Sequence, residues 1–238
     1  MSIIIKKGVT KKKPVAIFDI DGTIFRKNLQ FELLDGLSWK GIFSREARNK
    51  LVKYYRGWLE NKSSYEAYRE LLVSLYKKNI KKCSQKDVFL AARDVADFHH
   101  GRVFIYTSKL LEKLKKTHVT IAISGSPIEI VREFNRYLKF NQVFGTVFSL
   151  NKNGFYTGKE EFSPVLNKGK VVKSIILNEE FTLKNSYGIG DTTSDISFLK
   201  IVEHPIAFNP DLLLKRAAER NRWKIIVERK DVIYEIRE

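Results

Sequence analysis

The sequence predicts an α/β fold, in which a parallel sheet carries helices on both faces and a helical segment is inserted near the N-terminus. Short apolar runs alternate with helical patterns in the second half of the chain, an order typical of parallel strands joined by crossover helices. Residues 28–100 contain no proline and show repeated helical spacing. The 238 residues are long for one ordinary domain and short for two, which favours one core domain with an insertion.

The first predicted strand runs from Val15 to Phe18 and leads into D-I-D-G-T at residues 19–23. Asp19 and Asp21 are two residues apart, so their side chains leave the same face if the extended conformation continues. Two carboxylates this close repel each other unless a cation lies between them or one of them is protonated. Mg2+ is a divalent ion that prefers such oxygen ligands. A strand followed by an Asx turn is the alternative interpretation.

The inserted segment is predicted to be helical as far as Gly101, because its apolar residues recur at helical spacing. Ser84 is a possible N-cap for the last of these helices. Further strands and helices follow in alternation. The predicted elements are a strand at 119–123, a helix after Pro127, a hairpin at 143–150 and 155–157 around N-K-N-G, a helix at 168–177, a strand at 187–190, short strands at 205–208 and 224–227, and a helix at 212–219.

Small polar residues or carboxylates stand at the ends of three predicted strands. Asp19 and Asp21 follow the first strand, Ser124 and Gly125 follow the second, and the D-T-T-S-D motif at 191–195 follows a third. Ligands of open parallel sheets bind at the carboxyl ends of the strands. We therefore expect these clusters to meet in one crevice.

These motifs, in this order, resemble those of the haloacid dehalogenase superfamily of phosphotransferases. The matching stretches are D-I-D-G-T at 19–23, A-I-S-G-S around Ser124, N-K-G-K at 167–170 and G-D-T-T-S-D at 190–195. The resemblance implies a Rossmann-like three-layer core formed by residues 1–27 and 104–238, with a helical cap at 28–103 like that of the subfamily that includes phosphoserine phosphatase. The tail, H-P-I-A-F-N-P-D followed by N-R-W-K-I-I, looks like a branch described as lipid or small-molecule phosphatases.

The resemblance also implies roles for individual residues. Asp19 would be the nucleophile that takes the phosphoryl group, and Asp21 would protonate the leaving oxygen and then activate water. Sharing a site with an ionised neighbour is expected to raise the pKa of Asp21. Ser124 and the Gly125 amide would bind phosphoryl oxygens. Lys168 would neutralise charge there, with Lys170 as its rival.

The same resemblance implies a Mg2+ site. Its ligands would be Asp19, the backbone carbonyl of Asp21 and Asp191, while Asp195 would reach the metal-bound waters or orient Lys168.

Candidate contacts to the rest of the substrate lie outside the four motifs or at their edges. Asn28 stands where phosphoserine phosphatases have a glutamate, which counts against phosphoserine, although Glu32 could substitute. Arg26 and Lys27 would make the entrance basic, and Thr23, Asn28 and Arg26 are expected to contact the substrate. In the cap, Arg56 and Arg69 are possible partners for an additional anionic group.

We therefore expect a Mg2+-dependent phosphatase that hydrolyses a phosphomonoester through an aspartyl phosphate. The expected substrate is a small phosphorylated metabolite or a lysophospholipid or phosphatidylglycerophosphate-like molecule. Phosphoserine phosphatase activity and phosphoryl transfer to an acceptor other than water are the alternatives.

A formal net charge of +17 supports a competing class of function. Such an excess attracts polyanions, which include nucleic acids, anionic membranes and phosphorylated metabolites. The lysine clusters match no nucleic-acid recognition motif, so we interpret them mainly as solvated faces. A basic protein that contacts anionic lipid or nucleic acid is the resulting alternative.

Features relevant to location point to the cytoplasm. The single cysteine, Cys83, excludes an intrachain disulfide framework and fits a reducing compartment. No window approaches the roughly 20 apolar residues of a membrane span, and the N-terminal residues show no secretory cleavage pattern. We expect a cytoplasmic protein with no transmembrane segment, whose oligomeric state the sequence leaves open.

Overall fold

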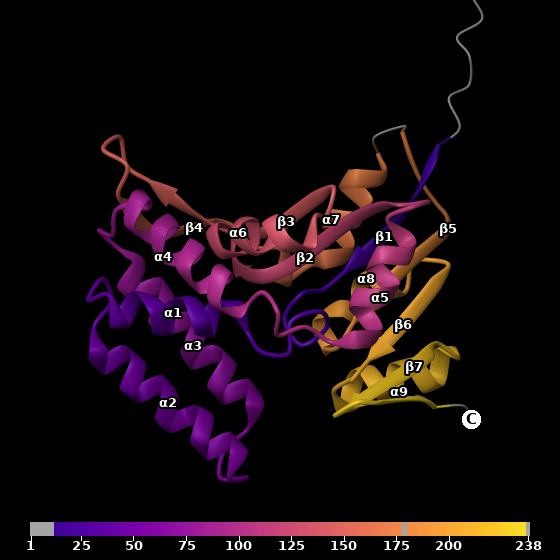
Figure 1. The fold of residues 1–238 in the computed structure, drawn as a ribbon, viewed down its shortest axis with the longest axis horizontal. Coiled ribbons are helices and arrows are strands. Elements are labelled where there is room, and N and C mark those ends of the chain that lie inside the picture. The colour runs from indigo at the N-terminus through magenta and orange to yellow at the C-terminus, as the bar shows by residue number, and fades with distance from the viewer. Residues whose placement is uncertain (1–11, 178–179, 237–238) are drawn as a thin grey trace, which may run out of the picture.

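A central sheet organises the fold in a computed structural model that describes residues 12–177 and 180–236 (Figure 1). Within those residues the strand order is β4-β3-β2-β1-β5-β6-β7-β8. The strands are β1 (Lys13–Phe18), β2 (Val119–Pro127), β3 (Gln142–Leu150), β4 (Tyr156–Phe162), β5 (Phe181–Gly190), β6 (His204–Phe208), β7 (Lys224–Arg229) and β8 (Val232–Ile236). The pairings from β3 to β7 are parallel, as the sequence predicts, whereas β4 and β8 pair antiparallel at the two edges.

The edge strand β8 is absent from the sequence prediction, because V-I-Y-E-I at 232–236 does not alternate apolar with polar residues. All residues of β8 are exposed. Its pairing with β7 across a tight turn, in which Lys230 has a φ of 55°, fixes it instead. The hairpin of β3 and β4 around N-K-N-G does follow the prediction.

Helices cover both faces of the sheet and also form the inserted segment. They are α1 (Leu29–Trp39), α2 (Arg45–Leu59), α3 (Tyr65–Ile80), α4 (Gln85–His99), α5 (Ile105–Leu114), α6 (Ile128–Leu138), α7 (Lys168–Ile176), α8 (Ile196–Leu199) and α9 (Leu212–Asn221), with 3-10 turns η1 (Pro164–Leu166) and η2 (Thr193–Asp195). Ala16 and Phe18 pack in the apolar cluster with α5 and α6, whereas Val15 and Ile17 pack with α7, α8 and α9. This alternation along β1 produces the three layers.

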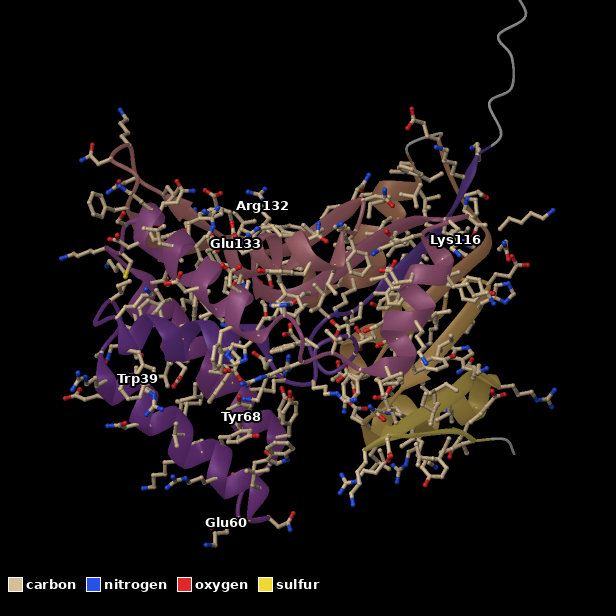
Figure 2. The ribbon with its side chains drawn as sticks, in the orientation of Figure 1. Trp39, Glu60, Tyr68, Lys116, Arg132 and Glu133 are labelled. Atoms are coloured by element: carbon tan, nitrogen blue, oxygen red, sulfur yellow. The ribbon has the colours of Figure 1, made fainter. Side chains whose placement is uncertain are left out.

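Helices α1 to α4 form the predicted cap, which lies to one side of the sheet in Figure 1. Asn28, Ser44 and Ser64 cap α1, α2 and α3 by accepting backbone N–H groups. Ser84 stands at the N-cap of α4, but its side chain makes no capping hydrogen bond. The cap interior includes Tyr68, which is 3% exposed (Figure 2).

Residues of the predicted cap contact the rest of the chain at several places. Phe25 and Val103, in the entering and leaving connections, form an antiparallel bridge. On α6, Glu133, labelled in Figure 2, forms an ion pair with Arg93 of α4. Arg93 Nε lies 3.3 Å from Glu133 Oε2. Cap and core side chains also share one apolar cluster. The division into a core of residues 1–27 and 104–238 and a cap of 28–103 stays a prediction.

Some sequence expectations concern the N-terminal segment and membrane spans. Residues 1–11, which hold the N-terminal segment and the first lysine of the run at 11–13, lie outside the described residues. Among residues 12–177 and 180–236, no helix combines the length and apolar character that crossing a membrane requires.

The sheet topology brings the motif-bearing strand ends together. β1 is central and lies between β2 and β5, and Phe18 is in register with both Ala122 and Ile189. The chain leaves β1 toward β2 and β3 and later returns to β5 on the other side of β1. A reversal of this kind opens a crevice at the carboxyl ends of the strands.

Candidate active site

Three carboxylates and one ammonium group meet at the ends of β1 and β5. The carboxylate oxygens of Asp19, Asp191 and Asp195 lie within 4.8 Å of one another. Lys168, at the first position of α7, donates to Asp19 Oδ1 at 2.5 Å and to Asp195 Oδ1 at 2.6 Å. Lys168 is 1% exposed, whereas its rival Lys170 is exposed. The structure therefore places Lys168 in the acidic cluster.

Burial dominates the electrostatics of this cluster. It raises the pKa of Asp19 to about 7, although the charge of Lys168 acts in the opposite direction. The pKa of Asp191 is also raised, by burial and by the charges of Asp19 and Asp195. Burial alone would lower the pKa of Lys168, but Asp19 and Asp195 more than offset it, and the pKa is raised. A single ammonium faces several acids, so the cluster favours an additional cation.

The donor set fits a hard divalent cation such as Mg2+. Asp19 Oδ2 is buried and has no hydrogen-bond partner among the described residues, so one carboxylate oxygen is available as a ligand. Gly22 leaves room for a second carboxylate, since a Cβ at this position would lie 2.0 Å from Asp191 Oδ2. Gly22 also has a φ of +83°, in the region that favours glycine.

Both carboxylate oxygens of Asp195 accept hydrogen bonds from groups of the protein. Its Oδ1 accepts from Lys168, and its Oδ2 accepts the backbone N–H groups of Asp191 and Thr192, each at 3.0 Å. Asp195 thus holds the Lys168 ammonium and also stands in the carboxylate group that could hold a metal.

Asp21 lies beside the acidic cluster, and its carboxylate is held by three donors. Leu29 N–H donates to Oδ1 at 2.6 Å, while the hydroxyls of Ser124 and Ser126 donate to Oδ2 at 2.6 and 2.8 Å. Burial raises the pKa of Asp21, and the hydrogen bonds from Ser124, Leu29 and Ser126 oppose that rise. The predicted direction is confirmed, but its main cause is burial rather than the charge of Asp19. The Asp21 side chain is not part of the group of carboxylates that could hold a metal.

Other predicted site residues have different surroundings. Thr23 is fully buried, and its hydroxyl donates to Asp191 Oδ1 at 3.2 Å, so it supports a carboxylate and does not line the cavity. Asn28 lines the cavity, but its side-chain oxygen accepts Phe31 N–H at the start of α1. Gly125 also lines the cavity, and a Cβ there would approach Val165 Cγ2 to 2.3 Å.

The structure does not bring Arg26 or Arg56 into the cavity. The guanidinium of Arg26 pairs with Glu228 at 2.5 Å and also donates to Val103 O, so it faces the end of β7. Arg56 lines a separate hollow along α2 together with Arg48. Sequence proximity to Asp19 suggested a basic entrance, but a buried carboxylate elsewhere in the fold attracts Arg26 more strongly.

The suggested substitute carboxylate, Glu32, is also committed elsewhere. Lys27 donates to its Oε1 at 2.8 Å, and His99 Nε2 lies 3.1 Å from its Oε2. Glu32 is 6% exposed and does not line the cavity.

A cavity of about 530 Å³ opens between the strand ends and helix α3. Arg69, a sequence candidate, lines it and pairs with Glu66 at 2.5 Å. Burial and the nearby charge of Asp191 raise the pKa of Tyr65, at the start of α3. No sequence motif predicts a site role for these further lining residues: Gln30, Tyr65, Glu66, Glu70, Lys77, Thr146 and Glu160, to which Ser126 is added. Only the S-G-S-P motif around Ser126 offered a signal for any of them.

Comparisons with known proteins support the same family. Residues 16–200 match the family described as haloacid dehalogenase-like hydrolase. The chain is 24% identical over 231 residues to a histidinol-phosphatase of Neisseria meningitidis, covering 90% of this chain and 98% of that protein.

Two solved structures share the fold. A protein of unknown function from Bordetella pertussis aligns with a TM-score of 0.70 at 19% identity, over 90% of this chain and 98% of that one. A phospho-aspartyl intermediate analogue of phosphoserine phosphatase aligns with a TM-score of 0.60 at 24% identity, over 93% of this chain and 96% of that one. The expected Rossmann-like α/β fold is confirmed. Because the family match takes in both aspartate motifs and most of the chain, this protein belongs to the haloacid dehalogenase-like hydrolases.

Proposed function

We propose that this hydrolase is a Mg2+-dependent phosphatase that cleaves a phosphomonoester through an aspartyl phosphate on Asp19. The observation that carries the proposal is the surroundings of Asp19. Lys168 neutralises one of its oxygens, and the other oxygen is buried without a partner beside Asp191. Charge stabilisation and positioning are the main requirements of phosphoryl transfer.

Asp19 and Asp191 are the residues that would hold the metal, with Asp195 close by. When bound, Mg2+ supplies positive charge that offsets the repulsion between the carboxylates and the substrate phosphate. Lys168 supplies further positive charge at Asp19, and Asp195 keeps its ammonium in place.

In the first step, a carboxylate oxygen of Asp19 forms a bond to phosphorus while the ester P–O bond breaks. The leaving oxygen takes a proton from Asp21. Leu29 N–H holds Oδ1 of the Asp21 carboxyl, and the hydroxyls of Ser124 and Ser126 hold Oδ2, so the proton donor stays in a fixed position. In the second step, Asp21 takes a proton from water as it attacks phosphorus, which releases phosphate and restores Asp19.

The cavity supports a small polar substrate. Its volume of about 530 Å³ lies within the range of small-molecule sites. Helix α3 lines it with acidic and basic side chains, Glu66, Glu70, Arg69 and Lys77. Apolar side chains, among them Leu72, Val73 and Leu166, line it as well, so the cavity suits a small phosphorylated molecule that also has an apolar part. The name of the Neisseria relative, histidinol-phosphatase, agrees with a small polar phosphomonoester.

Phosphate release from p-nitrophenyl phosphate and from a panel of phosphorylated metabolites and lipid phosphates tests the proposal. We expect turnover with Mg2+ that disappears with a chelator and in Asp19→Asn. Turnover retained by that variant would rule out Asp19 as the nucleophile. Added acceptor alcohols would reveal transfer to an acceptor other than water, because phosphorylated alcohol would then accumulate in place of phosphate.

A further inference from the structure

Two serine hydroxyls converge on a single oxygen of Asp21. Ser124 Oγ lies 2.6 Å and Ser126 Oγ lies 2.8 Å from Asp21 Oδ2, and both serines are buried, at 0% and 2% exposure. Ser126 N–H also donates to Ser124 Oγ at 2.9 Å. The family resemblance implies a phosphoryl contact for one serine, Ser124, whereas Ser126 is the serine that lines the cavity. The second hydroxyl therefore needs its own explanation.

The orientation of the Ser126 hydroxyl is fixed from both sides. Its oxygen accepts Gln30 N–H, from the first turn of α1, at 3.0 Å. A hydroxyl carries one hydrogen, and in Ser126 this hydrogen is directed at Asp21 Oδ2. Leu29 N–H, one residue earlier in the same helix, holds the other oxygen of Asp21. The start of α1 thus fixes the Asp21 carboxyl directly through Leu29 and indirectly through Ser126.

The resemblance implies a different task for Ser124, contact with a phosphoryl oxygen. Its single hydrogen cannot be donated to Asp21 and to a phosphoryl oxygen at the same time. When Ser124 turns to the phosphoryl group, Asp21 Oδ2 keeps a hydroxyl donor only if Ser126 stays in place.

We propose that Ser126 is a positioning residue that holds the Asp21 carboxyl while Ser124 binds the phosphoryl group. The inference rests on the proposed function, since it assigns Asp21 to protonation of the leaving oxygen. A misplaced Asp21 should lower kcat/KM more for substrates whose leaving group needs a proton. An alkyl oxygen needs the proton in order to leave, whereas p-nitrophenolate is stable enough to leave without it.

The test compares propyl phosphate with p-nitrophenyl phosphate in the wild type and in Ser126→Ala, both with Mg2+. The ratio of the two kcat/KM values is measured on one preparation, so the fraction of folded enzyme cancels. We expect Ser126→Ala to lower kcat/KM for propyl phosphate about tenfold more than for p-nitrophenyl phosphate, a part of the total that a positioned proton donor contributes. Ser126→Thr keeps the hydroxyl and should retain the wild-type ratio.

Ser38→Ala is the matched control. Ser38 is also fully buried and hydrogen-bonded, to Leu34 O at 2.9 Å, but it lies within the cap and does not contact Asp21. The ratio of the two kcat/KM values in Ser38→Ala should equal that of the wild type. An unchanged ratio in Ser126→Ala, or the same shift in Ser126→Thr, would overturn the inference while leaving the phosphatase proposal intact. A wild type that hydrolyses neither ester would refute the proposed function and this inference with it.

Discussion

Replacing Lys168 by methionine should strongly destabilise the metal-free protein. Lys168 is buried and donates to Asp19 and Asp195 at 2.5 and 2.6 Å, and Asp191 completes the acidic cluster. Methionine is of similar length but leaves those carboxylates without their cation. Removing one partner from a buried ion pair costs about 3–5 kcal/mol. For a chain of this size, that loss corresponds to a fall of about 6–20 °C in Tm.

The assay is thermal unfolding in the presence of a chelator at pH 7.5, followed by circular dichroism. Lys170→Met is the matched control, because Lys170 lies two residues further along α7 and is exposed. A surface substitution of this kind changes stability by no more than about 0.5 kcal/mol. The loss in Lys168→Met should shrink at pH 5.5, where protonation relieves the repulsion between the carboxylates. Equal Tm values for the two variants would refute the reasoning, because they would mean that Lys168 is not the balancing cation.

Three further predictions concern the site and its surroundings. Because burial raises the pKa of Asp19 to about 7 and also raises that of Asp191, the folded protein holds protons that the unfolded chain releases. Without metal, the stability that these groups contribute is therefore present below about pH 4 and lost as the pH rises through about 7. Mg2+ should consequently raise Tm more at pH 8 than at pH 5.5, and a shift that does not depend on pH would contradict this linkage. Gly22→Ala should abolish Mg2+ stabilisation, measured as the Tm shift, because its Cβ would meet Asp191 Oδ2 at 2.0 Å; an undiminished shift would exclude Asp191 as a ligand. Arg26→Ala should lower the free energy of unfolding by about 1–3 kcal/mol, because it removes the side-chain partner of buried Glu228. Its KM should stay within about twofold of the wild-type value, and a larger rise in KM would place Arg26 at the substrate after all.

The interior strands and the acids at their ends could be predicted from sequence because each is a local pattern. The apolar run before Asp19 marks β1, and the D-T-T-S-D motif marks the end of β5. The parallel order of these strands then requires their ends to share one edge of the sheet. Local composition likewise marked the N-K-N-G hairpin. The predicted cap residue Ser84 stands at the start of α4 but makes no capping hydrogen bond.

The direction of individual side chains could not be predicted in the same way. Arg26 follows the first motif closely, yet it turns to Glu228, about 200 residues away in the chain. Tyr65 has the same helical spacing as cap residues that pack internally, so periodicity does not identify it as a cavity residue. Ser126 reads as part of a turn until Asp21 and Gln30 are seen on either side of its hydroxyl.

The sequence by itself indicated which strands carry the motifs, the acids and the lysine that stand at their ends, and the family to which the chain belongs. These features follow from residues that are neighbours in the chain. The tertiary structure alone decided which charges pair, which face of α3 lines the cavity and which donors hold Asp21. Such choices depend on contacts between distant segments, where burial makes each unpaired charge costly and selects one partner among several.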